Sequence, residues 1–345
     1  MSFIHLPKAP AFLAEYAAVA EPRLREFLES KRSAFERLPV ELGDAFALLR
    51  DYVLRGGKRL RGALVLIGHR AGGGAAGSDA ALDASIGVEL LHAYLLIHDD
   101  FMDRDELRRG GPTLHRSLGD DHLGGSLALL LGSLCQAWAY QLVLRRGDAA
   151  PVAAEVMSRT LEEVTLGQLA DLRAPTGAPL GEKAVLELQR LKTGSYTFEM
   201  PLRIGASLAH APASLLDALS AYARPLGQAF QIADDLLGTF GAPEVTGKPN
   251  ASDLREGKRT LLVARALERA APDEAAVLRA GLGRSDADVD SLRAILRRTG
   301  AEQECRDDAG RLCAQALAAL DRAPLPAAVR KDLREIATYA VNRAL

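Results

Sequence analysis

Apolar residues recur at three- and four-residue spacing along most of this chain, and no other sequence feature constrains its fold more. The stretches at 21–38 and 276–301 show the pattern clearly, and both are rich in the helix-favouring residues Ala, Leu, Glu and Arg. Alternating β patterns flanked by Asn-Gly or Asp-Gly turns are absent from the sequence. The sequence therefore predicts an all-α protein.

Short stretches rich in Gly and Pro interrupt the helical pattern. They lie at 70–80, 173–183, 210–214, 241–253 and 321–328. Their lengths are those of connections between helices, not of linkers between domains. A chain of 345 residues can bury a large core. We expect residues 1–345 to form one domain, a bundle of about ten or more helices.

Charge and cysteine content exclude several classes of protein. The net charge of −2 lacks the strong basic excess of a nucleic-acid-binding domain, so we expect no nucleic-acid partner. Three widely spaced cysteines (Cys135, Cys305 and Cys313) make neither a disulfide framework nor a zinc site. The first residues lack the basic and apolar parts of a signal peptide. These features predict a cytoplasmic location.

One uncharged stretch, Ser126 to Leu144, is long enough to cross a bilayer. It carries two Ser and two Gln, and otherwise consists mainly of Ala, Leu and Gly, as tightly packed interior helices do. We therefore interpret it as a buried core helix and expect no transmembrane segment.

An acidic motif ends a long apolar helix, which the pattern predicts over roughly Leu82 to Glu106. In "LLIHDDFMDRDELRRG" (Leu95–Gly110), Asp99 and Asp103 are four residues apart and share one helix face, with His92 two turns earlier. Like charges at this spacing repel, so a purely structural helix gains nothing from them. A solvated helix end with a chance acidic cluster is the weaker alternative. Carboxylates suit a hard cation such as Mg²⁺.

A second acidic motif, "QAFQIADDLLGTFG" (Gln228–Gly241), repeats this arrangement. An apolar helical run ends in Asp234 and Asp235, with Gln231 one turn before them. We expect the two motifs to face each other across the bundle and to hold magnesium ions between them.

Basic residues supply the opposite charge. "RGGKRLRG" (Arg55–Gly62) places Arg55, Lys58, Arg59 and Arg61 around two glycines, which let the backbone approach an anion closely. Arginine also binds phosphate oxygens in a bidentate manner. More cations follow at Arg108, Arg109, Lys192, Lys248 and Lys258. Singly, each is typical of a solvated surface; with two magnesium-type motifs they indicate a polyanion, and diphosphate is the simplest candidate. The sequence contains no P-loop, G-x-S-x-G or H-E-x-x-H motif.

Six motifs together resemble a known family. They are "GGKRLR", "ELLHAYLLIHDDFMDRDELRRGGPTLH", "GQLADL", "LKTGSY", "FQIADD" and "TGKPNASDLREGKRT", and the match covers about 55–266. The chain resembles the trans-type (head-to-tail) polyprenyl diphosphate synthases, which include farnesyl and geranylgeranyl diphosphate synthases. The resemblance implies a helical bundle of the isoprenoid synthase type with a central active-site cavity. It also implies a homodimer.

The resemblance further implies a magnesium-dependent prenyltransferase. Such an enzyme condenses isopentenyl diphosphate with dimethylallyl, geranyl or farnesyl diphosphate and releases diphosphate. About three Mg²⁺ ions would be shared with the substrate. The implied magnesium ligands are Asp99, Asp103 and Asp234, which are also catalytic together with Lys192 and Lys258, and Asp100 supports them. The implied isopentenyl diphosphate site is Lys58, Arg61, His92 and Arg109. The implied allylic diphosphate site is Arg108, Lys192, Thr193, Gln231, Lys248 and Lys258.

Two positions bear on activity and product length. Gly238 stands where the family usually has a last Asp of the second motif, which leaves one ligand in doubt. We favour an active enzyme, with a non-catalytic subunit of a heteromer as the alternative, and expect an Asp at 238 to be tolerated. Tyr94 lies about 7 Å before Asp99 along the helix and would close the cavity, whereas Leu95 is not aromatic. This resembles geranylgeranyl (C20) synthases more than farnesyl (C15) synthases, although Tyr94 could simply pack in the core and a slightly longer product stays open.

A class I terpene cyclase is the nearest rival enzyme. It also uses D-D-x-x-D and magnesium in an all-α fold. It needs no isopentenyl diphosphate site, and the resemblance assigns "GGKRLR" and His92 to that site.

Overall fold

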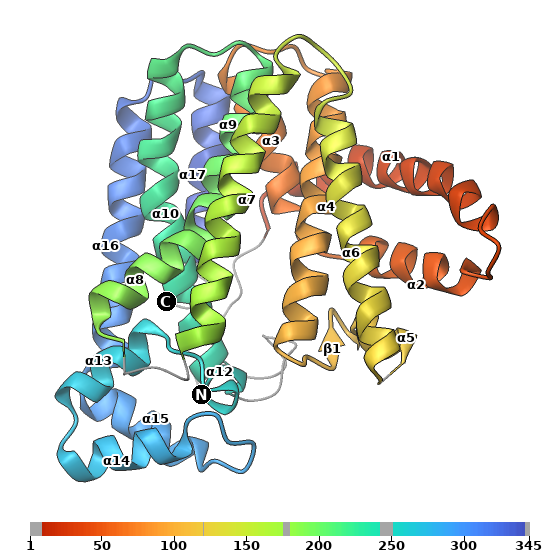
Figure 1. The fold of residues 1–345 in the computed structure, drawn as a ribbon. Helices are drawn as coiled ribbons and strands as arrows, with labels where there is room; N and C mark the ends of the chain where they lie inside the picture. Colours follow the sequence, from red (N-terminus) through yellow and green to blue (C-terminus); the bar gives the residue numbers. More distant parts are fainter. Residues whose placement is uncertain (1–8, 120, 175–179, 242–250, 342–345) are drawn as a thin grey trace. The chain divides into compact units, whose positions relative to one another are not determined.

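The computed structural model describes residues 9–119, 121–174, 180–241 and 251–341 (Figure 1). The chain forms two compact units. The N-terminal unit comprises Ala11–Glu155 with Pro201–Ala211, and the C-terminal unit comprises Val156–Met200 and Pro212–Leu345. The single domain expected from the sequence stays a prediction.

Helix α4 is the central element of the N-terminal unit. The helices of this unit are α1 (Ala11–Glu36), α2 (Gly43–Leu54), α3 (Leu60–Ala71), α4 (Asp79–Met102), α5 (Leu114–Leu118) and α6 (His122–Val143), and α7 (Ala150–Arg173) begins in it. Helix α4 packs against both α3 and α6. Its middle, from Ala84 to Leu91, is buried at every position. A helix that is buried all round needs apolar residues on every face, as this stretch mostly has.

Glycines bring α3 and α9 (Met200–Leu208) into backbone contact. A Cβ atom on Gly205 would lie 1.9 Å from the carbonyl oxygen of Val65, and one on Gly68 would lie 2.2 Å from that of Leu202. Any larger residue would push the two helices apart. This contact fixes α3, whose first turn contains Arg61, the last cation of the basic motif.

Helix α10 (Ala213–Phe240) organises the C-terminal unit. The other helices of this unit are α8 (Glu182–Gln189), α12 (Ser252–Glu256), α13 (Leu261–Arg269), α14 (Pro272–Gly281), α15 (Val289–Arg298), α16 (Ala301–Arg322) and α17 (Ala327–Val341). Helix α10 packs against α16 and α17, and the Tyr222 hydroxyl donates a 2.6 Å hydrogen bond to the carbonyl of Leu333.

A π-helix, η2 (Arg190–Glu199), continues α8 and carries "LKTGSY". It lies against α10 where two glycines meet, because a Cβ atom on Gly227 would be 2.5 Å from the carbonyl oxygen of Gly194. Gly167 of α7 also lies close to η2, since its Cβ would be 2.9 Å from the backbone nitrogen of Lys192. π-Helical turns are rare and often occur at functional sites.

The structure confirms the all-α prediction and most connections. The stretches at 70–80, 210–214 and 321–328 join helices as expected; parts of 173–183 and 241–253 lie outside the described residues. The helix predicted over Leu82 to Glu106 begins earlier and ends earlier, at Asp79–Met102. Beyond it the chain makes a small antiparallel hairpin, β1 (Leu107–Arg108) and β2 (Gly111–Pro112), which the sequence pattern did not predict.

Helices α4 and α6 are both long and apolar enough to cross a membrane by length and composition. In the most apolar 18-residue window, 67% of α4 is buried inside the protein but only 44% of α6. The stretch at 126–144 is therefore only partly buried, and the expected core helix presents an apolar face to solvent. Leu123, Leu130 and Leu134 lie on this face, at 62%, 65% and 37% exposure.

Candidate active site

Two partly exposed carboxylates stand at the C-terminal end of α4. Asp103 caps the helix, and its backbone N–H donates to the carbonyl of Asp99 at 2.8 Å. The C-terminal end of a helix is the negative end of its dipole, so carboxylates are unfavourable there unless a cation offsets them. A hard cation fits this donor set. Among the described residues no three His, Cys, Asp or Glu side chains converge on one metal position, so further oxygen ligands would come from water and substrate.

The neighbouring Asp100 has a structural task. It is fully buried, and it accepts hydrogen bonds from the Tyr52 hydroxyl at 2.6 Å and from Arg108 Nε at 2.7 Å. Burial raises the pKa of Asp100, and the Arg108 charge opposes that rise. Arg108 also pairs with Asp105 at 2.8 Å. Asp100 therefore anchors the hairpin to α4, and its support of the magnesium ligands stays a prediction.

The hairpin turn consists of Arg109 and Gly110. Both have positive φ angles, 52° and 74°, as the central residues of a type I′ turn do. Arg109 occupies a conformation that non-glycine residues rarely adopt, and such strain is found mainly at functional sites. Its guanidinium donates to the carbonyl of Gly56 at 2.8 Å. Arg55 of the basic motif in turn donates to the hairpin, at the carbonyl of Pro112, with a distance of 2.8 Å.

Glycines make room for these crossing arginines. Gly57 has a φ of 123°, and a Cβ atom on it would be 3.0 Å from the guanidinium carbon of Arg109. A Cβ atom on Gly111 would be 2.4 Å from Arg55 Nη1. The hairpin and the basic motif are thus interlocked through Arg55 and Arg109.

The basic motif is also held from α4. Arg59 starts α3 with a φ of 49° and is buried, with its guanidinium 3.3 Å from Glu89 and 3.1 Å from the carbonyl of Val53. The other Glu89 oxygen accepts from the backbone N–H of Gly62 at 2.8 Å. Lys58 remains exposed. Glu89 therefore fixes the first turn of α3 on α4.

His92 lies at the centre of this positive charge. Its Nε2 is 3.4 Å from Arg61 Nη1. Burial lowers the pKa of His92 well below its ordinary value, and the nearby charges of Arg61, Arg109, Arg108 and Arg59 lower it further. A neutral imidazole beside Arg61, with three further guanidinium charges nearby, is suited to a multiply charged anion. The structure thus brings together Arg61, His92 and Arg109 as expected, and Arg108 acts on the same ring.

Tyr94 and Leu95 lie one turn before the acidic end of α4. The Tyr94 ring is 4.5 Å from the His98 ring, and His98 Nε2 is 3.1 Å from the carbonyl oxygen of Leu129 on α6. Burial, together with Tyr140, raises the pKa of Tyr94. Tyr94 is thus braced against α6, while Leu95 is partly exposed. Their part in product length stays a prediction.

Lys192 stands on η2 in the C-terminal unit. Its Nζ donates to Asp171 of α7 at 2.7 Å, and both side chains are partly exposed. The close approach of Gly167 fixes the backbone of Lys192 beside α7. The side chain of Thr193 and the whole of Lys248 lie outside the described residues.

The second acidic motif divides its two aspartates between two environments. Asp235 is buried and accepts from Gln231 at 2.7 Å and from Gln189 at 2.6 Å. Burial and the nearby charge of Asp253 raise the pKa of Asp235 well above its ordinary value. Asp234 is partly exposed, and its role as a magnesium ligand stays a prediction. That the two acidic motifs face each other stays a prediction.

Lys258 follows α12. Its Nζ is 2.7 Å from Glu256 and 3.7 Å from Asp253. Because Asp253 also acts on Asp235, Lys258 belongs to the same group of charges as the second acidic motif.

Sequence reasoning missed the side chains that hold the site residues. They are Tyr52, Glu89, Asp171, Gln189 and Asp253. Three of them could have been found, because Glu89 begins "ELLHAYLLIHDDFMDRDELRRGGPTLH", Asp171 lies in "GQLADL" and Asp253 lies in "TGKPNASDLREGKRT". The other two, Tyr52 and Gln189, carry no local signal, since their contacts span 48 and 46 residues.

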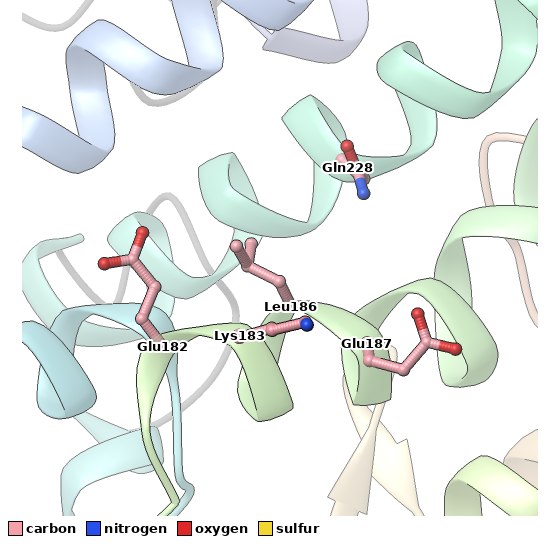
Figure 2. Close-up of a pocket in the computed structure, with 5 residues that line it drawn as sticks. All are labelled: Glu182, Lys183, Leu186, Glu187 and Gln228. Atoms are coloured by element: carbon pink, nitrogen blue, oxygen red, sulfur yellow. The ribbon is translucent and has the colours of Figure 1, made fainter.

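A pocket of about 580 Å³ in the C-terminal unit does not coincide with these groups (Figure 2). Helix α8 contributes Glu182, Lys183, Leu186 and Glu187, and α10 contributes Gln228. Its lining carries both acidic and basic side chains. Glu182 is already paired with Arg265 at 2.6 Å. No predicted site residue lines it.

Comparisons with known proteins point to one family. A family model described as polyprenyl synthetase matches residues 45–299. A geranylfarnesyl diphosphate synthase of Aeropyrum pernix is 35% identical over 84% of this chain and 91% of its own length. A geranylgeranyl diphosphate synthase of Methanosarcina mazei is 38% identical over 67% of this chain and 69% of its own length. A crystal structure of geranylgeranyl pyrophosphate synthase from Corynebacterium glutamicum, complexed with isoprenyl diphosphate and magnesium, superposes with a TM-score of 0.91 at 35% identity, covering 96% of this chain and 99% of that one.

Binding of an anion beside His92 is expected to raise its pKa. A bound diphosphate would offset the guanidinium charges that disfavour the imidazolium, so the anion should bind more tightly as pH falls through the range below the ordinary His value. NMR titration of the His92 ring with and without inorganic pyrophosphate, assigned with His92→Asn, measures this. A His92 pKa that stays the same when pyrophosphate is bound would contradict the anion site.

Proposed function

The chain belongs to the polyprenyl synthetase family, and on that premise we propose that it is a magnesium-dependent prenyltransferase that makes geranylgeranyl diphosphate (C20). It condenses isopentenyl diphosphate with dimethylallyl, geranyl or farnesyl diphosphate and releases diphosphate. Relatives named as geranylgeranyl, geranylfarnesyl and farnesyl diphosphate synthases support a short-chain product. Farnesyl diphosphate or a slightly longer product is the alternative.

The observation that carries this proposal is the cluster of arginines around the neutral His92. Lys58, Arg61, His92 and Arg109 would bind the diphosphate of isopentenyl diphosphate through charge-assisted hydrogen bonds. A terpene cyclase has no isopentenyl diphosphate to bind, so the cluster favours a synthase. The allylic diphosphate would be bound by Arg108, Lys192, Thr193, Gln231, Lys248 and Lys258.

The residues of the site would divide the chemistry among them. When bound, magnesium supplies positive charge to the diphosphate as it leaves. Asp99, Asp103 and Asp234 would hold it, in about three ions shared with the substrate. Lys192 and Lys258 would stabilise the negative charge that develops as the allylic C–O bond breaks.

Carbon–carbon bond formation follows at the allylic cation. The double bond of isopentenyl diphosphate attacks the cation, and the new cation loses a proton, which the departing diphosphate accepts. Water would capture either cation, so the chain must bind its allylic tail away from solvent. The mostly apolar helix before Asp99 is suited to line such a space.

The direct test is a product assay. Purified protein with Mg²⁺, labelled isopentenyl diphosphate and each allylic primer should give C20 as the longest main product. Asp103→Ala should lower turnover by at least about 100-fold, because it removes a metal ligand. Glu106→Gln, a nearby acid whose side chain is 77% exposed, should retain activity.

Several outcomes of this assay would count against the proposal. No incorporation by the protein alone would favour a non-catalytic subunit of a heteromer. A cyclic hydrocarbon formed without isopentenyl diphosphate would favour a cyclase. A main product of C15 would leave the synthase in place and refute C20.

Tyr94 is proposed to set product length from its braced position beside His98. Tyr94→Ala should shift the main product from C20 to longer chains, because it removes the ring that would stop the growing tail. Tyr94→Phe keeps the ring and should leave the product unchanged. Chromatography of the dephosphorylated products measures both. Identical chain lengths for Tyr94→Ala and wild type would assign Tyr94 to packing alone.

We also propose a cytoplasmic homodimer. The exposed apolar face of α6, with Leu123, Leu130 and Leu134, supports a protein partner, since apolar faces of this kind usually mark interfaces. Leu130→Glu should shift the sedimentation coefficient from dimer to monomer. Val277→Glu, at an exposed position on α14, should leave it unchanged. A wild-type protein that sediments as a monomer would contradict the dimer.

A further inference from the structure

Gly238 lies inside α10, four residues after Asp234, and needs an explanation. A glycine within a helix costs about 1 kcal/mol relative to alanine. The helix continues past it, with the N–H of Gly241 donating to the carbonyl of Leu237 at 2.8 Å, so no unusual backbone angle requires glycine here. The reason must therefore lie in the space beside it.

A carboxylate fills that space. A Cβ atom on Gly238 would lie 2.0 Å from Asp253 Oδ2, 2.5 Å from its Cγ and 3.0 Å from its Oδ1. The side chain of Asp253 thus reaches from α12 into the volume that a side chain at 238 would occupy. Residues four apart on a helix share a face, with Cβ atoms about 5–6 Å apart. The Asp253 carboxylate is therefore beside the face of α10 that carries Asp234.

We propose that Asp253 supplies the carboxylate that residue 238 lacks and acts on the metal ion held by Asp234. The inference rests on the proposed function, since it takes magnesium to be bound at Asp234. When magnesium is bound, the Asp253 carboxylate would assist Asp234 in holding the ion, as a ligand or as a hydrogen-bond acceptor for its water. The second acidic motif is then completed from another helix rather than left one ligand short.

The backbone around Asp253 holds the carboxylate in position. The N–H of Lys258 donates to the Asp253 carbonyl at 2.9 Å, and the N–H of Gly283 donates to the carbonyl of Leu254 at 3.0 Å. Gly257 ends α12 with a φ of 74°, and a Cβ atom on it would lie 2.9 Å from the Cα atom of Gly283. The Asp253 side chain is only 13% exposed. It is thus placed before any ion binds.

This arrangement reverses the expectation that Asp would be tolerated at 238. The added Cβ atom would overlap Asp253, and its carboxylate would add a second negative charge beside the first. Gly238→Asp and Asp253→Ala should each be harmful alone and should compensate each other when combined.

Manganese binding tests the proposal without relying on turnover. Free Mn²⁺ is measured by EPR as it is titrated into the protein with inorganic pyrophosphate. Asp253→Ala should weaken one Mn²⁺ site by about 10–100-fold, the usual effect of removing a carboxylate that orients or assists a metal ligand. Gly238→Asp should also weaken it. The double variant Gly238→Asp/Asp253→Ala should return to within about threefold of wild type, a coupling expected only of side chains that share one space.

A matched control, Glu256→Gln, shows whether Asp253 acts on the metal ion or only positions Lys258. Glu256 lies closer to Lys258 Nζ than Asp253 does, at 2.7 Å against 3.7 Å. If Asp253 acted only through Lys258, Glu256→Gln would weaken Mn²⁺ binding as much as Asp253→Ala. That result would overturn the proposal, as would a double variant no better than Asp253→Ala.

The behaviour of the wild type separates failure of this inference from failure of the proposed function. An active wild type whose Mn²⁺ affinity survives Asp253→Ala would refute only the role of Asp253. A wild type that binds no Mn²⁺ with pyrophosphate and incorporates no isopentenyl diphosphate would refute the proposed function and this inference with it.

Discussion

The buried ion pair between Asp100 and Arg108 is the interaction on which the candidate isopentenyl diphosphate site depends. A carboxylate with no exposed surface is costly unless its charge is balanced and its oxygens are hydrogen-bonded, and Arg108 and Tyr52 do both. The pair fixes the hairpin on α4. The hairpin turn in turn presents Arg109 to the basic motif and to His92. The buried charge of Asp100 thus positions the hairpin and, through it, Arg109.

In the C-terminal unit, close backbone contacts position the candidate site residues. Gly167 and Gly227 let α7 and α10 approach η2, which places Lys192 beside Asp171. Asp235 accepts hydrogen bonds from Gln189 and Gln231, so it orients the end of α10, where Asp234 is the aspartate proposed to bind a cation. In both acidic motifs, therefore, one aspartate is buried as an anchor and another is left partly exposed.

The family resemblance implied that Arg61 and His92 share one site. Local pattern predicted the helices and the two acidic motifs, because periodicity and residue type carry that information. It did not predict the hairpin, whose turn has an arginine in a conformation usually taken by Gly, Asn or Asp. It gave no reason for Gly238, because only tertiary structure shows that Asp253 occupies the space beside it. The anchors Tyr52 and Gln189 were missed for the same reason. The partial exposure of α6 was missed because hydropathy does not show which face of a helix is covered.

The central claim is that carboxylates of both acidic motifs hold metal ions for a diphosphate. Crystals grown with Mn²⁺ and pyrophosphate, with data collected at the manganese edge, test it most directly. We expect anomalous peaks about 2.1–2.3 Å from carboxylate oxygens of Asp99 and Asp103 and of Asp234, with pyrophosphate oxygens completing the ligands. Pyrophosphate bound with no manganese at these aspartates would contradict it.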